Sequence, residues 1–352
     1  GSGTPMRGAV IAWLLAVLAL LFAMIIVGGL TRLTDSGLSI TEWKPVTGAI
    51  PPLSESAWEA EFEKYRQIPE YEVVNKGMSL ADFMSIYWLE WAHRVLGRLI
   101  GVAFLLPFLF FLWRSAIPRA LIPRMWVIFA LGGFQGALGW FMVMSGLTER
   151  TDVSQYRLAA HLSVAFLIFA MVFWTLLDIL RGGADGTARA PELYRRAAWG
   201  FAGLVFAQII LGAFVAGTDA GFVYNTWPLM DGRFVPDGVM MLNPWWINFT
   251  ENVTTIQFQH RIGAYVVTLA AIALWVWSLR LGLPKRARIA AAHVPALVLL
   301  QVALGIWTLI AVVPVALGAA HQAMAVALFA ASLWHAHAVS ATALSPVQPA
   351  SA

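Results

Sequence analysis

The stretch Tyr87-Trp88-Leu89-Glu90-Trp91-Ala92-His93-Arg94-Val95-Leu96-Gly97-Arg98-Leu99-Ile100-Gly101 places a carboxylate and an imidazole inside an apolar run that continues to about Trp113. Glu90 and His93 are three residues apart, so in a helix they share one face and can point at the same object. An ionisable group in a membrane span costs about 2.5–3.5 kcal/mol on insertion scales, so it usually faces a cavity, a partner or a cofactor. The pattern recurs as Gln257-Phe258-Gln259-His260-Arg261, with an amide in place of the carboxylate. We therefore interpret the chain as an internal repeat, with His93 in the first copy and His260 in the second.

The composition is that of a membrane protein. Of 352 residues, 60% are hydrophobic and only 12% are charged, about half the charged share of an ordinary soluble domain. The net charge of +4 is modest and no basic run is typical of a nucleic-acid surface, which excludes nucleic acid as a partner. The chain has no Cys, which excludes disulfides, iron–sulfur clusters and thiolate-ligated haem. Any metal ligand must therefore be His, Met or a carboxylate.

Several apolar runs are long enough to cross the lipid bilayer as helices, which need about 20 residues each. There are eight of them, near residues 9–30, 86–113, 124–145, 156–180, 196–217, 253–279, 290–312 and 316–338. We expect an all-α membrane protein with eight transmembrane helices. Basic residues cluster at the N-terminus and in alternate short loops, which by the positive-inside rule are cytoplasmic together with both termini. These residues are Arg7, Arg114, Arg119, Arg124, Arg181, Arg189, Arg195, Arg196, Arg280, Lys285, Arg286 and Arg288.

The start of the chain favours a bacterial plasma membrane. The run 9–30 is too long for a signal-peptide core, and no Arg- and Ser-rich presequence precedes it. Residues 1–5, before Met6, are interpreted as a cloning remnant, and residues 341–352 as a disordered tail.

The opposite, outer side carries two long segments, residues 31–85 and 218–252. Residues 54–67 have a helical pattern, because aromatic side chains recur at three- and four-residue steps from Trp58. We predict an amphipathic helix that lies over the outer mouth of the protein. A segment of this length acts as a lid or a binding surface, or it only connects two spans; the sequence leaves both readings open.

An internal repeat divides the chain, because four segments of the first half return in the second half in the same order. They are Gly28 to Gly37 with Gly217 to Gly221, His93-Arg94 with His260-Arg261, Gln135 to Trp140 with Gln301 to Trp307, and His161 with His321. Four spans separate the copies, so both halves share one orientation and are related by an axis along the membrane normal. We expect two pseudo-symmetric four-helix bundles, residues 6–182 and 190–340, joined by the Gly-rich linker 181–187.

Four of the seven histidines lie at matched places, namely His93, His161, His260 and His321. Each lies about 6–12 Å from the outer end of its span, so two imidazoles should face each other in each bundle. Two histidines on facing helices are a familiar arrangement for haem iron with two axial nitrogens. A zinc site would need further ligands, and the second half offers none at that level. The alternative of four histidines that only hydrogen-bond between helices does not readily explain a repeated pairing.

The residues beside these histidines are the next candidates. Arg94, Arg98 and Arg261 suit the propionates of haem, because Arg satisfies planar carboxylates in a low dielectric. An ion pair with Glu90, or snorkelling to the interface, is the alternative. Glu90 can relay protons or stabilise positive charge, which the amide of Gln257 cannot do. One half is therefore expected to be reactive, and the other to transfer electrons.

Five further polar residues are interpreted as structural. Gln135 and Gln301, with their neighbouring glycines, favour close helix packing. His293, His335 and His337 lie at the cytoplasmic edge and are expected to be interfacial.

Longer motifs are more specific than an isolated Glu-x-x-His-Arg pattern. They are Thr31 to Ser39, Trp43 to Pro52, Glu90 to Arg94, Thr218 to Gly221 and Asn225 to Pro228. Together with the repeated histidine pairs, they resemble the haem A synthase family, membrane enzymes that convert haem O to haem A for cytochrome oxidase. The resemblance covers about residues 9–339 and implies eight helices with one haem per half. Because it has no Cys, the chain resembles the cysteine-free branch of this family, which mitochondria and alphaproteobacteria share.

The resemblance also implies roles for the candidate residues. His260 and His321 would bind a haem b cofactor, while His93 and His161 would frame the substrate site with Glu90 beside it. The implied reaction oxidises the C8 methyl of haem O to a formyl group, through successive hydroxylations with loss of water. Haem b would supply electrons from a donor that the sequence does not identify. A haem O synthase, the farnesyltransferase that makes the substrate, would suit as a partner, and a homo-oligomer is compatible with the sequence.

Two other classes of protein are alternatives. A dihaem electron-transfer protein similar to cytochrome b would stagger its haems across the bilayer, whereas all four histidines lie toward the outer face. A transporter built from parallel repeats would carry polar residues near mid-membrane in several spans, and these spans show few.

Overall fold

The structure is a computed structural model that describes residues 6–148, 154–181 and 190–340. Within these ranges every regular element is a helix, and the only β pairing is an isolated bridge between Met230 and Arg233. Eight helices are long and apolar enough to cross a membrane. They are α1 (Arg7–Leu33), α4 (Leu80–Trp113), α5 (Ile122–Thr148), α6 (Gln155–Arg181), α7 (Glu192–Gly217), α9 (Val253–Ser278), α10 (Lys285–Ile310) and α11 (Val315–Ser340). The prediction of an all-α protein with eight spans is confirmed.

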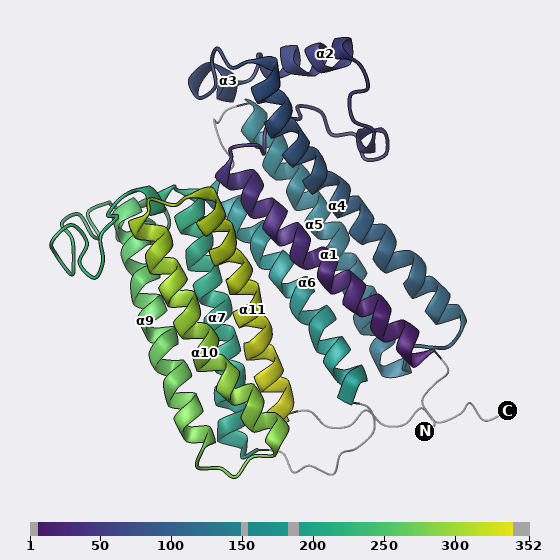
Figure 1. Cartoon of the computed structure of the whole chain (residues 1–352), viewed down its shortest axis with the longest axis vertical. Coiled ribbons are helices and arrows are strands. Elements are labelled where there is room, and N and C mark those ends of the chain that lie inside the picture. Colours follow the sequence, from purple (N-terminus) through teal and green to yellow (C-terminus); the bar gives the residue numbers. More distant parts are fainter. Residues whose placement is uncertain (1–5, 149–153, 182–189, 341–352) are drawn as a thin grey trace.

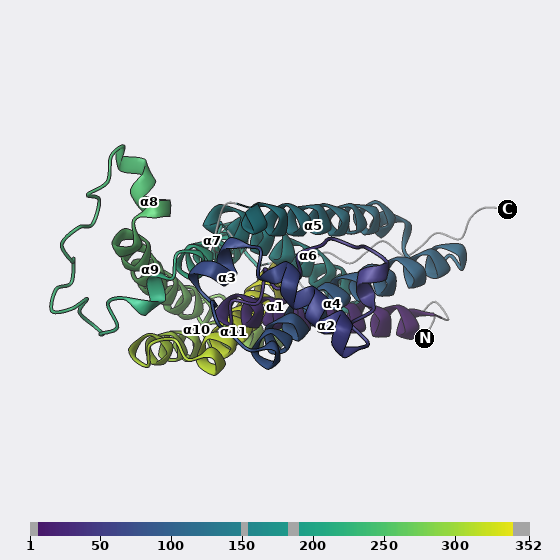
Figure 2. The ribbon, with the colours of Figure 1, turned by 90° about the horizontal axis from the view of Figure 1, so that it is seen from above.

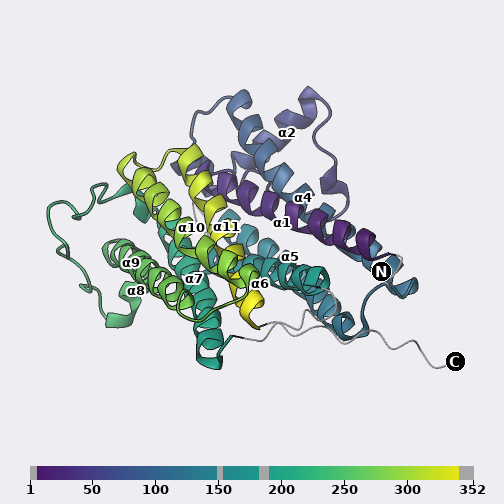
Figure 3. The same cartoon turned by 60° about the horizontal axis from the view of Figure 1, so that its bottom comes forward.

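The eight long helices pack as two groups of four (Figures 1 and 3). In the first group α1 packs against α4 and α6, and α5 contacts both α4 and α6. In the second group α7 packs against α9 and α11, and α10 contacts both α9 and α11. The order of packing along the chain is therefore the same in both groups. Most of the predicted linker, Arg189 and the two terminal segments lie outside the described residues.

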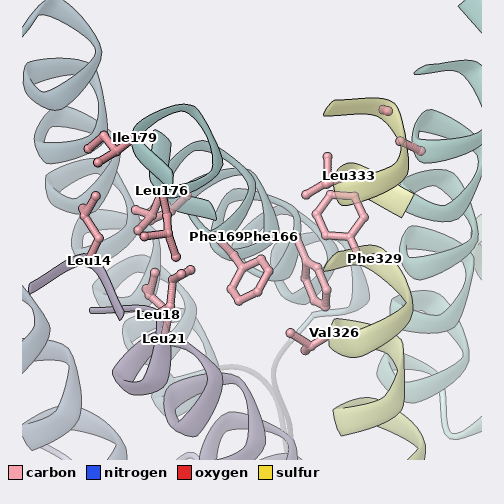
Figure 4. Close-up of a cluster of buried hydrophobic side chains, with 14 of the residues drawn as sticks. Leu14, Leu18, Leu21, Phe166, Phe169, Leu176, Ile179, Val326, Phe329 and Leu333 are labelled. Carbon is pink, nitrogen blue, oxygen red and sulfur yellow. The ribbon is translucent and has the colours of Figure 1, made fainter. Parts of the chain in front are cut away.

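The two groups meet where α1 packs on α11 and α6 packs on α7. A cluster of buried aliphatic and aromatic side chains fills the space between α1, α6 and α11 (Figure 4). Its members include Leu14, Leu18 and Leu21 of α1, Phe166, Phe169, Leu176 and Ile179 of α6, and Val326, Phe329 and Leu333 of α11. The rings of Phe166 and Phe329 lie edge to face with their centroids 5.5 Å apart, a preferred aromatic geometry.

Two leucine–glycine contacts hold the groups together near their outer ends. A Cβ atom on Gly318 would lie 2.9 Å from Cδ1 of Leu33, so α1 and α11 approach closely there. On the other side, a Cβ atom on Gly217 would lie 3.5 Å from Cδ2 of Leu158 and 2.7 Å from the backbone of Gln155. Small residues at helix crossings allow this approach in a membrane, where packing rather than water exclusion drives association.

The helix α4 begins earlier than predicted, at Leu80 rather than near residue 86. Ser79 and Asp82 form a capping box, in which each side chain accepts a hydrogen bond from the backbone N–H of the other residue. The cap adds turns that hydropathy alone does not mark. As a result α4 has 34 residues and extends outward beyond its neighbours (Figure 1).

The amphipathic helix predicted after Ser54 is confirmed as α2 (Glu55–Tyr65). Trp58 and Phe62 are buried against the first turns of α4, where Phe62 stacks on Phe83 at 4.9 Å. Seen from above, α2 and the short α3 (Pro69–Val73) cover the outer end of the first group (Figure 2). The remaining short elements are η1 (Thr47–Ala49), η2 (Arg119–Leu121), η3 (Ala220–Phe222), η4 (Trp245–Ile247) and α8 (Asn248–Glu251).

The first residue of α1 and the last of α11 lie at the same end of the molecule, opposite the two long segments (Figure 1). This arrangement agrees with an even number of spans. That this end faces the cytoplasm stays a prediction, as does the action of α2 as a lid.

Candidate functional site

The histidines of the first half form a close pair. His93 lies on α4 and His161 on α6, and their ring centroids are 6.4 Å apart with an angle of 53° between the planes. Two metal–nitrogen bonds of about 2 Å each would place two imidazole centres about 6 Å apart. The pair is therefore spaced to share one metal ion.

A glycine on a neighbouring helix lies against each of the four imidazoles. Gly28 and Gly212 lie six residues before Thr34 and Thr218, and Gly139 and Gly305 lie four residues after Gln135 and Gln301, so they occupy matched places in the repeat. A Cβ atom on these glycines would lie 3.3 Å from Nε2 of His93, 3.5 Å from Cε1 of His161, 3.3 Å from Cε1 of His260 and 2.9 Å from Cε1 of His321. Each ring thus faces a helix of its own four-helix group. In both halves, a glycine of that helix packs against the ring.

Glutamine side chains fix the helices that carry the histidines. Gln135 donates from Nε2 to the backbone oxygen of His161 at 2.8 Å, and Gln301 donates to that of His321 at 2.9 Å. The prediction that these two residues serve helix packing agrees with these bonds. In metal sites, such bonds around the ligands orient the rings and tune the metal.

Gln208 is a further residue of this kind, and sequence analysis missed it. Its Nε2 donates to the backbone oxygen of His260 at 2.8 Å and lies 3.1 Å from Nδ1 of the same ring. The first half has Met24 at the corresponding position, four residues before Gly28. The sequence feature that could have indicated Gln208 is that it is the single amide side chain in the apolar run between Ala197 and Gly217.

Glu90 is buried, with 2% of its surface exposed. Its Oε2 accepts hydrogen bonds from the Ser39 hydroxyl and the Ile40 backbone N–H, both at 2.7 Å. Its Oε1 accepts from Nη2 of Arg94 at 2.9 Å. The ion pair with Arg94, which the sequence left open, is therefore formed, and the outer segment supplies the other two donors.

The two arginines of α4 bind the backbone of the same outer segment. Arg94 donates to the carbonyl oxygens of Glu42 at 2.8 Å and Ile40 at 3.2 Å. Arg98 donates to those of Pro45 at 2.6 Å and Lys44 at 2.7 Å. One nitrogen of each guanidinium, Nε of Arg94 and Nη1 of Arg98, stays buried without a partner.

The second half repeats the contact of Arg94, while Tyr265 stands at the position of Arg98. Arg261 donates to the carbonyl oxygens of Tyr224 at 2.7 Å and Thr226 at 2.8 Å, which occupy the positions of Ile40 and Glu42 after the aspartate of each repeat. The corresponding aspartates, Asp35 and Asp219, both have left-handed backbones, with φ values of 53° and 56°. The outer segments of the two halves therefore leave α1 and α7 through the same left-handed residue.

Gln257 takes the place of Glu90 and is equally buried. It donates from Nε2 to the carbonyl oxygens of Ala220, at 2.8 Å, and Val223. Its Oε1 accepts from Nε and Nη2 of Arg261 at 3.1 and 2.9 Å. The remaining nitrogen of Arg261, Nη1, is buried without a partner.

The chemistry of these groups limits what the sites can hold. Among the described residues, no cluster of three or more His, Asp or Glu side chains could bind a metal ion. A metal between two imidazoles must then obtain its other ligands from a bound group, as the iron of haem does. Buried guanidinium nitrogens without partners, described above for Arg94, Arg98 and Arg261, are donors for that group's anionic edge. These residues fit a haem in each half.

Two of the histidines expected at the cytoplasmic edge are buried between helices. His337 lies 2.8 Å from Asp178, which also pairs with Arg124 at 2.7 Å, and this cluster joins the two halves. His335 lies 2.7 Å from the hydroxyl of Tyr194. Both are near the end of α11, about 20 Å or more from His321 at 1.5 Å per residue. These contacts agree with the predicted structural role, and the location at the cytoplasmic edge stays a prediction; the third of these histidines, His293, is exposed.

The fold and the site define a class of protein, a multi-pass membrane protein in which each four-helix half holds one pair of imidazoles. A family model described as cytochrome oxidase assembly protein matches residues 11–333. The heme A synthase of Parvibaculum lavamentivorans is 55% identical over 325 residues, which cover 92% of this chain and 92% of that protein. The heme A synthases of Nitrosospira multiformis and Rhodospirillum centenum are 49% and 52% identical over 329 residues each, which cover 92% and 94% of this chain and 92% and 88% of those proteins. The chain belongs to the haem A synthase family, and the predicted resemblance is confirmed.

Proposed function

We propose that this protein oxidises the C8 methyl group of haem O to a formyl group and so produces haem A. The observation that carries this proposal is the duplicated pair of imidazoles, one of which, His93 with His161, is spaced to share one metal ion. The substrate would bind at this pair, in the half that also contains a buried carboxylate. A resident haem b would bind at His260 and His321.

The residues of the second half suit a haem b cofactor. His260 and His321 would ligate its iron, and Gly212 and Gly305 leave room for their rings. The free Nη1 of Arg261 would donate to a propionate. When bound, haem b would supply one-electron transfer. The chain's own residues would bind it and orient its ligands.

The arginines of the first half suit the propionates of the substrate. Arg94 and Arg98 each have other N–H groups held by carbonyl oxygens of the outer segment, so the guanidinium planes are fixed before an anion arrives. One N–H on each remains free and buried. A carboxylate bound there would neutralise charge in a low dielectric, where Arg is better suited than Lys.

Glu90 brings negative charge within one helical turn of His93, which would favour a positively charged state of the substrate. The protein would act in a bacterial plasma membrane, with both imidazole pairs toward the outer side. His161 and His321 each lie six residues after the first residue of their helices, so their depths match.

The partners of this protein would include an electron donor, a haem O synthase that delivers the substrate, and further copies of this chain.

Extraction of haem from the purified protein tests the proposal. We expect haem B together with haem O or haem A, and formation of haem A when the protein is added to membranes that contain haem O. His93→Ala should abolish product formation while haem B is retained, and His260→Ala should remove haem B. Two haem B molecules per chain without haem A formation would instead support a dihaem electron-transfer protein.

A further inference from the structure

The two outer segments present opposite polarity to the residue three positions before the histidine, and their backbones differ there, because Tyr224 is left-handed with a φ of 52° whereas Ile40 is not. In the first half, two donors face Glu90, namely the Ser39 hydroxyl and the Ile40 N–H. In the second half, two acceptors face Gln257, the carbonyl oxygens of Ala220 and Val223. Glu90 and Gln257 thus differ together with the segments that they contact.

The Ser39 hydroxyl accounts for one of the two donors, and the peptide between residues 39 and 40 supplies the other, because it turns its N–H toward α4 whereas the peptide between residues 223 and 224 turns its carbonyl toward α9. Ser39 corresponds to Val223, and Ser36 corresponds to Ala220. The Ser39 oxygen lies 2.9 Å from the Ser36 carbonyl and 2.7 Å from Glu90. It therefore stands between the side chain of α4 and the carbonyl that Gln257 reaches directly in the second half.

The numbers of donors and acceptors explain why the first outer segment needs a carboxylate at position 90 and the second an amide at position 257. An ionised carboxylate only accepts, whereas an amide donates through nitrogen and accepts through oxygen. An amide at position 90 would direct an N–H group at the Ile40 N–H. A carboxylate at position 257 would direct an oxygen at two carbonyl oxygens. Either mismatch leaves buried polar groups unpaired, which is costly.

We infer that Glu90 is a positioning residue: with Arg94 it fastens residues 39–42 onto α4 beside His93, as Gln257 with Arg261 fastens the corresponding segment beside His260. The inference rests on the proposed function, because the site that this contact organises is the proposed substrate site. The carboxylate is chosen by the donors of its segment rather than by a need for proton transfer. The positioning effect passes through Arg94, whose free N–H is oriented by the same contacts.

A polarity exchange tests this inference. The variants are Glu90→Gln, Ser39→Val and the double variant S39V/E90Q, which gives the first half the side chains of the second at both positions. Glu59→Gln on α2, an exposed residue of the same region, is the matched control. The measurements are hydrogen exchange of residues 39–45, KM and kcat for haem O, and the visible spectrum of haem in the first half.

The positioning role predicts a rescue. Glu90→Gln should raise KM and speed exchange of residues 39–45 by about tenfold, because two buried hydrogen bonds are lost. In the double variant the amide introduced at position 90 can donate to the carbonyl oxygens of residues 36 and 39 once the peptide between residues 39 and 40 turns over to the orientation of the second half, so both quantities should return to within about threefold of the wild type. A residue that transfers protons predicts that kcat stays as low in S39V/E90Q as in Glu90→Gln.

The outcomes separate this inference from the proposed function. Exchange of residues 39–45 can be measured in protein without substrate, so the contact is tested even if the first half binds no haem O. Restored protection with no recovery of kcat would overturn the positioning role and make Glu90 a catalytic residue. Unchanged protection in Glu90→Gln would show that the contact does not hold the segment. Val223→Ser with Gln257→Glu should together preserve haem b, whereas Gln257→Glu alone should lose it.

Discussion

The imidazole of His321 lies so close to Gly305 that a Cβ atom at position 305 would approach its Cε1 to 2.9 Å. A distance of this kind leaves no room for a side chain. The ring can keep its position only while residue 305 is glycine.

Gly305→Ala should therefore displace the His321 ring and weaken haem b binding, by at least tenfold in affinity if one axial bond is strained. The ratio of haem B to protein and the visible spectrum would report the change. Gly132→Ala, on a helix surface with nothing within 4 Å of the new methyl group, is the control and should be silent. Retention of a normal haem b spectrum in Gly305→Ala would contradict the placement of His321 as a ligand.

The two matched glutamines should affect different haems. Gln301→Leu removes the bond to the His321 backbone, and Gln135→Leu removes the bond to His161. Each hydrogen bond between membrane helices is worth about 0.6 kcal/mol on average. We expect Gln301→Leu to weaken haem b binding about threefold and Gln135→Leu to raise KM for haem O by a similar factor. Titration of each haem into depleted protein would distinguish the two, and equal effects on both sites would argue against independent halves.

Asp178 should matter for stability but not for haem binding. It pairs with Arg124 and His337 and so joins α5, α6 and α11 at the end away from the histidine pairs. Asp178→Ala should destabilise the protein by about 1–3 kcal/mol, because it leaves partly buried polar groups unpaired. The apparent melting temperature would show this loss, with the haem spectra unchanged. Glu192→Ala breaks the exposed pair with Arg196 and should have almost no effect.

Glu42 predicts a pH dependence of the outer segment. Hydrogen bonds from Lys44, and then from Lys64 of α2, lower the pKa of Glu42 from 4.5 to about 2. Because the pKa is lower in the folded protein, the stabilisation is fully present above pH 4.5 and is lost as the pH falls through about 2. Glu42→Gln should speed hydrogen exchange in α2 at pH 6, and its difference from the wild type should shrink between pH 4.5 and 2. A constant difference across this range would show that the ion pairs do not hold α2.

The sequence predicted the parts of this molecule that depend on periodicity. Apolar runs predicted the eight spans, and aromatic spacing after Ser54 predicted α2. The repeated His-Arg pattern predicted the candidate site residues on α4 and α9, namely His93 with Arg94 and His260 with Arg261. These features follow from burial, which leaves a regular trace in the sequence.

The sequence did not predict contacts made through the backbone. Arg94 and Arg98 bind carbonyl oxygens of a segment about 50 residues away, and carbonyl groups carry no sequence signal. Ser39 ends one of the motifs that carry the family resemblance, but nothing in the sequence indicated that its hydroxyl donates a hydrogen bond to Glu90. The early start of α4 depended on a capping box, which operates over four residues and is independent of hydropathy.

The contacts between the halves have a consequence for the way in which the halves pair. Leu33 and Gly217 are corresponding residues, each directly before the threonine of its repeat, and Leu158 and Gly318 each lie three residues before a histidine. Leu33 contacts Gly318, and Leu158 contacts Gly217. Each half therefore contributes one leucine and one glycine, and the two contacts join the same two positions of the repeat with the halves exchanged. Such reciprocity belongs to isologous dimers, in which one surface pairs with itself. The two halves of the present chain thus meet through these contacts as the two subunits of an isologous homodimer would.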